Sequence, residues 1–152
     1  MRKHNEGYTL VLVMVVLAVL SVLATVILTA AERNLEAHKH GVQYMQNKYL
    51  AQGEIEKVLG YLEAHIGESN VQLPDMEDYE NLTCTPDVNK IRLIAIRYEE
   101  KDGEQYEVLR IDCTIQITNE DGDLATIIDG NILELGGYSY LSYKVSTDGG
   151  AE

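Results

Sequence analysis

The chain has 152 residues and a formal net charge of -13, from 25 acidic and 12 basic side chains. Nucleic-acid binding needs clustered cations that displace counterions from phosphates, so this balance argues against DNA or RNA as a direct partner. The length allows one domain of ordinary size plus an appendage.

The first element is an apolar segment, residues 8–31, which carries no charged side chain. A helix of this length spans on the order of 35 Å, enough to cross a hydrocarbon core of about 30 Å. Arg2 and Lys3 precede it and the next basic residue is Arg33, so the positive-inside bias places the N-terminus in the cytoplasm. We expect a single-pass protein of the cytoplasmic membrane whose later residues are exported to the cell surface.

A short basic leader, residues 1–7, stands before this segment. The junction reads Met1-Arg-Lys-His-Asn-Glu-Gly7 followed by Tyr8-Thr-Leu-Val-Leu-Val. It resembles the class III leader junction of type IV prepilins, in which a membrane-embedded prepilin peptidase cuts after the glycine and N-methylates the new first residue. The resemblance implies cleavage between Gly7 and Tyr8 and N-methylation of Tyr8.

A different cleavage remains open at the other end of the apolar segment. The small residues Ala30 and Ala31 suit an ordinary signal peptidase, and a cut after Ala31 would release a soluble domain. The segment is long for a signal peptide and the helical pattern continues through its end. Both features favour a retained anchor.

The chain departs from the usual pilin pattern at the fifth mature position. Most pilins carry Glu there, and in the family this buried carboxylate is thought to pair with the free amine of a neighbouring subunit. Here the position is Leu12, and residues 8–31 contain no acid. Subunits without the acid resemble PilX-like and type II secretion K-like minor pilins, so the resemblance implies a role at the filament tip or in initiation.

The next segment, residues 32–66, continues the helix in a polar form. Apolar side chains recur at helical spacing: Leu35, Val42, Met45, Tyr49, Ile55, Leu59, Leu62 and Ile66. The run Lys48-Tyr-Leu-Ala-Gln-Gly-Glu-Ile-Glu also resembles the stretch that follows the anchor in PilX-type sequences. We predict one helix from about Tyr8 to His65; a coiled coil is the alternative, but the stripe is short and rich in glycine.

Residues 67–90 are polar and acidic and contain Pro74 and Pro86. This composition predicts a surface loop, with local helix near residues 76–82. In pilins the corresponding connection varies and contacts neighbouring subunits.

Residues 91–152 change to a period of two and predict an antiparallel head. We expect strands at 91–98, 106–118, 124–135 and 138–146, with Asp-Gly turns between the first three. Such a meander of about four strands would pack its apolar face on the long helix. The fold class is therefore α+β and pilin-like.

Two cysteines, Cys84 and Cys113, suit an exported domain. An even pair in that compartment predicts a disulfide, with Cys113 on the apolar face of its strand and Cys84 in the loop before the sheet. Two unpaired buried thiols are the alternative. Neither cysteine has a CxxC neighbour or a nearby histidine, which argues against a metal or redox role.

Catalytic and metal signatures are missing from the sequence. His38 and His40 lie two apart, on different sides of a helix, while His4 and His65 stand alone. The acidic run 119–123 lacks the spacing and the terminal Glu of a calcium loop and is typical of an Asp-Gly turn. We expect no enzyme activity, no catalytic residue, no metal and no cofactor.

Three tyrosines, Tyr138, Tyr140 and Tyr143, cluster in the last predicted strand. Packing within the strand accounts for them, and a subunit or adhesive contact is the functional alternative.

The resemblance as a whole implies a minor pilin or pseudopilin of a type IV pilus-like or type II secretion-like filament. Its implied partners are the prepilin peptidase, the membrane, and other pilins through the N-terminal helix. A single-pass exported binding or sensor protein that does not polymerise is the alternative from another class, and an uncut Arg2-Lys3 leader would mark it.

Overall fold

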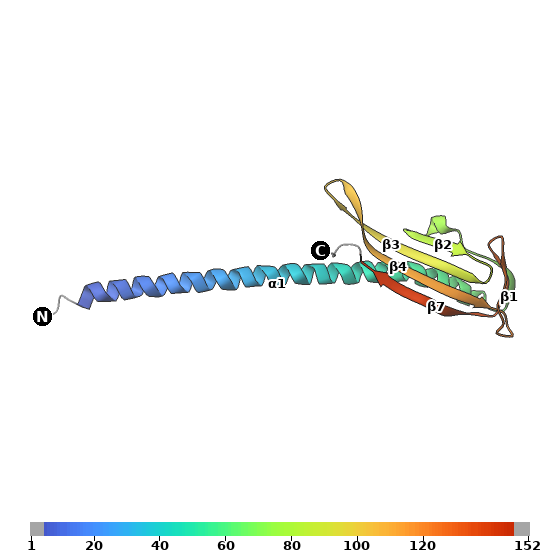
Figure 1. Cartoon of the computed structure of the whole chain (residues 1–152), viewed down its shortest axis with the longest axis horizontal. Coiled ribbons are helices and arrows are strands. Elements are labelled where there is room, and N and C mark those ends of the chain that lie inside the picture. Colours follow the sequence, from blue (N-terminus) through green and yellow to red (C-terminus); the bar gives the residue numbers. More distant parts are fainter. Residues whose placement is uncertain (1–4, 148–152) are drawn as a thin grey trace. The chain divides into compact units, whose positions relative to one another are not determined.

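The structure is a computed structural model that describes residues 5–147, with side chains from Tyr8 onward. Its first element is the helix α1, Asn5–Ala64, which runs without a break (Figure 1). This confirms the predicted helix to within a few residues at each end. The contacts between residues divide the chain into two compact units, Met1–Gln43 and Tyr44–Glu152.

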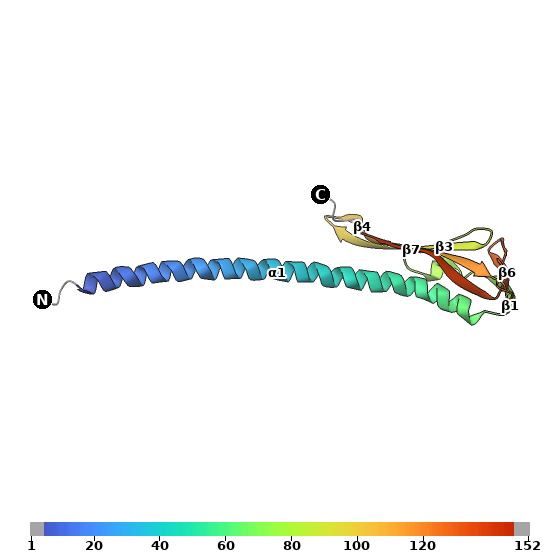
Figure 2. The same cartoon turned by 60° about the horizontal axis from the view of Figure 1, so that its bottom comes forward.

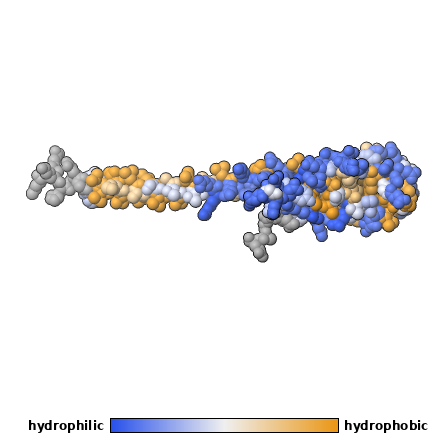
Figure 3. All heavy atoms as spheres, turned by 90° about the horizontal axis from the view of Figure 1, so that it is seen from above, coloured by the Kyte–Doolittle hydropathy of each residue, from blue (hydrophilic) through white to orange (hydrophobic). Residues whose placement is uncertain are grey.

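The first unit is helical wherever it is described. Every side chain from residue 8 to residue 43 is exposed, and the most apolar window of α1 has none of its residues buried. Hydrophobic side chains cover the apolar segment, and hydrophilic ones follow it (Figure 3). The helix is long and apolar enough to cross a membrane, and its exposure distinguishes it from the core helix of a soluble domain.

The second unit, called the head, contains a four-stranded antiparallel sheet. Its order is β2-β3-β4-β7, from β2 (Leu82–Pro86), β3 (Lys90–Lys101), β4 (Glu104–Thr118) and β7 (Gly137–Ser146). The strands predicted from the period of two at 91–98, 106–118 and 138–146 are confirmed. Asp102 and Gly103 form the two-residue hairpin turn between β3 and β4, and both have a positive φ, as that turn requires.

A second sheet of three short strands corrects two predictions. Its order is β1-β6-β5, from β1 (Glu68–Gln72), β6 (Asn131–Leu135) and β5 (Ile127–Ile128). Residues 67–90 are therefore not only a loop, because they contain β1, the 3-10 helix η1 (Met76–Asp78) and β2.

The predicted third strand of the meander, residues 124–135, was also wrong as a single strand. Asp129 and Gly130 both have a positive φ, so the backbone turns there and separates β5 from β6. β6 then pairs with β1, far away in sequence, instead of with β4. Burial explains the pairing, because Ile132 is fully buried opposite Val71.

The core lies between the four-stranded sheet and the last part of α1, which Figure 2 shows beneath the strands. The helix contributes Ala51, Ile55, Val58, Leu59 and Leu62, at the spacing of one helix face. The sheet contributes alternate residues of β3 and β4, namely Ile91, Leu93, Ala95, Leu109, Ile111, Cys113, Ile115 and Ile117. The predicted α+β fold, a long helix packed on antiparallel strands, is confirmed.

The predicted disulfide is wrong for this fold, because Cys84 and Cys113 are both free. Cys84 on β2 lies opposite Leu93 of β3, and Leu93 lies opposite Cys113 of β4. A whole strand therefore separates the two cysteines, and two strand spacings of about 4.8 Å exceed the Cα separation that a disulfide spans. Burial raises the pKa of Cys84 to about 11 and also raises that of Cys113, so both thiols stay protonated.

Candidate functional site: the N-terminal helix

The predicted cleavage junction lies at the start of α1. Residues 1–4 of the leader, with Arg2, Lys3 and His4, lie outside the described residues, whereas Gly7 and Tyr8 belong to the helix. The bond between them lies in the helix, so any peptidase that cut it would require the helix to unwind locally. A glycine near a helix end lowers the cost of that unwinding, by up to about 1 kcal/mol relative to alanine.

Leu12 lies one helical turn beyond Tyr8, on the same side of α1. Both side chains are exposed, Tyr8 at 74% and Leu12 at 52%. The position that carries a carboxylate in most pilins therefore holds an exposed apolar side chain in this chain. No acid within residues 8–31 is available to offset a neighbouring amine.

The hydroxyls of Ser21, Thr25 and Thr29 interrupt the second half of the apolar segment, and each is satisfied by its own helix. Ser21 donates to the carbonyl of Ala18, Thr25 to that of Ser21, and Thr29 to that of Thr25, each at 2.8 Å. In a hydrocarbon environment an unpaired hydroxyl is costly, and these bonds remove that cost without a partner helix. Sequence reasoning treated the segment only as uncharged, although the spacing of 21, 25 and 29 already indicated such bonds.

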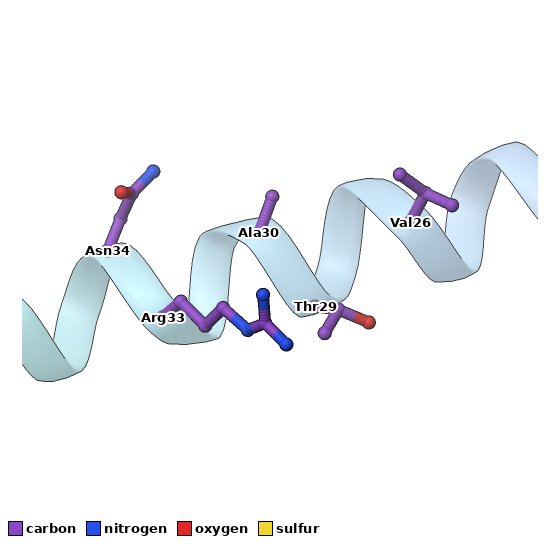
Figure 4. A pocket seen from close by; sticks show the side chains of 5 residues that line it. All are labelled: Val26, Thr29, Ala30, Arg33 and Asn34. Carbon is purple, nitrogen blue, oxygen red and sulfur yellow. The ribbon is translucent and has the colours of Figure 1, made fainter.

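A polar surface on α1 marks the end of the apolar segment. Val26, Thr29, Ala30, Arg33 and Asn34 surround a shallow depression on α1, and in Figure 4 the side chain of Arg33 extends along the helix on the side of Thr29. All five residues come from one helix, so the depression is an open surface and not an enclosed cavity. Arg33 is the first cation after the leader and marks the end of the apolar stretch.

His65 and the acidic run have local structural contacts. His38 and His40 are exposed on α1, whereas the ring of His65 packs on Tyr61 at 4.2 Å and its Nδ1 lies 2.7 Å from the Tyr61 carbonyl oxygen. In the acidic run the Asn119 side chain accepts a hydrogen bond from the Asp123 amide, which closes the turn. Within residues 5–147 there is no group of three or more side chains arranged to hold a metal ion.

The three tyrosines of the last strand lie together on β7. Tyr138 and Tyr140 contact each other edge to face, with ring centroids 6.3 Å apart. Burial raises the pKa of all three hydroxyls, and at Tyr143 it outweighs the lowering effect of a hydrogen bond from Gln52. They face the core side of the sheet and are only partly covered by it.

Comparison with family models, with curated proteins and with solved structures gives no match for this chain.

Proposed function

We propose that the chain is a minor pilin or pseudopilin, a filament subunit that is anchored in the cytoplasmic membrane before assembly. One observation carries the proposal: an exposed, uncharged helical segment begins directly after Gly7 and continues without a break into the helix of the β head. The sequence resemblance to prepilins at Gly7–Tyr8 gives the same assignment independently.

The apolar segment has to be covered by something other than water. Its exposed Leu, Val and Ile side chains each favour transfer from water by about 1.5–3 kcal/mol. Lipid covers them in the membrane, and a bundle of like helices covers them in a filament. A helix in which the hydroxyls of Ser21, Thr25 and Thr29 are already satisfied suits both environments.

Leader removal provides the step between the two states. Before the cut, Arg2 and Lys3 hold the N-terminus on the cytoplasmic side, because moving their charges through hydrocarbon is unfavourable. After the cut only the new amine of Tyr8 remains, and the helix is free to leave the bilayer for a helix bundle.

The lack of an acid at Leu12 favours a tip or initiation position. A subunit in the shaft would bury its partner's amine against this surface, and Leu12 offers that amine no carboxylate. A first subunit has no earlier amine to neutralise. Leu12→Glu should therefore lower the number of filaments. Leu12→Gln, whose side chain has the shape of glutamate without its charge, separates the effect of charge from that of polarity. Unchanged filament numbers in Leu12→Glu would overturn the tip assignment.

The mature N-terminus is the decisive measurement for the class. Intact mass and N-terminal peptides should show a start at N-methylated Tyr8 in cells with a prepilin peptidase and a retained leader in cells without it. Gly7→Val should block the cut, and Gly41→Ala, a glycine of the same helix with open space around it, should not.

Two other results would contradict the proposal. A leader retained in the presence of the peptidase would identify a single-pass surface protein that does not polymerise. A start after Ala31 would identify an ordinary secreted domain.

A further inference from the structure

A tyrosine-walled groove lies within the second unit, between β7 and residues 52–59 of α1. Ile55 and Leu59 line it from the helix, Tyr140 and Tyr143 from the strand, and Gln52 and Glu56 from the helix surface. Its volume of about 250 Å³ is below the roughly 300–1,000 Å³ of ordinary small-molecule sites. Side chains of a docked segment suit it better than a separate small ligand.

A bulge in the sheet aims both tyrosines at this groove. Tyr143 lies opposite Cys113 and Tyr140 opposite Ile115, and both partners are fully buried on the core side of β4. Residues three apart on a regular strand face opposite sides, but the register shifts between Thr114 and Ile115, so Tyr140 and Tyr143 share a face. Bulges that re-aim side chains in this way are enriched next to functional sites.

The groove runs beside a free sheet edge. β7 is the last strand of its sheet and, among the described residues, pairs only with β4. It is ten residues long and carries one charge, Lys144. A long edge strand with few charges presents a row of unpaired backbone groups on which an extended segment can pair.

Charge selects the chemistry of the partner. Glu56 lines the groove and its charge acts on the hydroxyls of Tyr140 and Tyr143, while Glu63 acts on Tyr138. Residues 44–147 carry 20 acidic and 8 basic side chains, so a second head would be repelled. Anionic lipid headgroups would be repelled as well.

We propose that β7 and this groove bind an extended protein segment in which basic residues alternate with apolar ones. The segment adds to β7 as a fifth strand of the sheet. Its Lys or Arg side chains lie along Ile55 and Leu59, with the cation against the tyrosine rings and the Glu56 carboxylate.

The test uses the full chain in detergent micelles and a fluorescent peptide of four Lys-Val repeats. Anisotropy should show saturable binding, and a peptide of four Glu-Val repeats should not bind. Glu56→Lys should weaken binding at least tenfold, whereas Glu100→Lys, an equal charge reversal on the exposed end of β3, should change it less than twofold. Far-UV circular dichroism checks that both variants keep their strands and helix.

Amide hydrogen exchange locates the bound peptide. Exchange in residues 138–146 should slow when it binds, and exchange in β2, the opposite edge of the sheet, should not. Equal weakening by Glu56→Lys and Glu100→Lys would mean attraction by bulk charge and would overturn the site. Self-association of the peptide-free chain that slows exchange in β7 would make a second copy the occupant instead. None of these outcomes depends on where the leader is cut.

Discussion

The two regions of the chain use apolar side chains in opposite ways. In residues 8–43 they are exposed all round one helix. In the head, residues 44–147, a set of them alternates along strands or follows one helix face and forms a buried core. The head therefore has a core of its own, whereas burial of the apolar segment in lipid or against other helices would be favourable. Substitutions of one residue type in the two regions should accordingly have different consequences.

The largest difference should come from leucine truncation. Leu62 is fully buried between α1 and the sheet, so Leu62→Ala should lower the free energy of unfolding of the head by about 2–5 kcal/mol. Leu35, in the same helix, is 70% exposed, and Leu35→Ala should change that free energy by less than about 0.5 kcal/mol. Urea unfolding followed by circular dichroism measures both. Equal losses would show that the head extends further along α1 than residues 44–64.

The reverse experiment places a charge in the apolar segment. Leu17→Arg should raise the free energy of membrane insertion by about 3–4 kcal/mol, because residue 17 lies near the middle of the stretch. Leu35→Arg lies beyond the segment and should have little effect. Carbonate extraction should release more of Leu17→Arg than of Leu35→Arg from membranes. The free energy of unfolding of the head should be unchanged in both variants. Full retention of Leu17→Arg would argue against a spanning helix.

The same contrast explains what the sequence predicted. Long elements with strong periodicity, α1, β3 and β4, were predictable because many residues repeat one pattern. β1 and β2 were missed because each has five residues and one buried side chain, Val71 or Leu82, so no alternation is visible. Short pairings of this kind depend on distant strands, which a local pattern does not report.

The site residues divide in the same way. The roles of Gly7, Tyr8 and Leu12 are predicted from a contiguous junction that a local pattern can report, and they stay predictions. The disulfide between Cys84 and Cys113 was predicted from compartment and number, but strand order decides the distance, and β3 lies between them. The groove beside β7 was missed because it needs the bulge that brings Tyr140 and Tyr143 to one face.

Glycine substitutions sharpen the comparison further. A Cβ at Gly136 would lie 2.0 Å from the backbone carbon of Asn119, so Gly136→Ala must move the backbone where β6 leads into β7. We expect a loss of about 1–3 kcal/mol in the stability of the head. Gly60→Ala, in the open on α1, should instead stabilise by up to about 1 kcal/mol. The melting temperature should fall for Gly136→Ala and rise for Gly60→Ala. An unchanged melting temperature in Gly136→Ala would contradict the close approach of Gly136 to the Asn119 backbone.

The smallest effect should appear in acid and only in the head, where the Arg92–Asp112 ion pair joins the neighbouring strands β3 and β4. Asp112 of β4 accepts hydrogen bonds from the Arg92 guanidinium of β3, which lowers the pKa of that carboxyl below its ordinary value. A carboxylate with a lowered folded pKa stabilises the fold above its unfolded pKa of about 3.9, and the contribution disappears as the pH falls through the folded pKa. The melting temperature should therefore decline below about pH 4.

Removing the carboxylate tests the origin of that decline. Asp112→Asn should melt at a lower temperature at neutral pH. Its melting temperature should also decline less steeply below about pH 4, because the amide cannot titrate. Asp102→Asn removes an equal charge from the hairpin turn, where asparagine also tolerates a positive φ, and should keep the slope. If Asp112→Asn kept the full slope, the acid sensitivity would belong to other carboxylates of the head. The N-terminal helix has no acid within residues 8–31, so its retention by the membrane should not follow this titration.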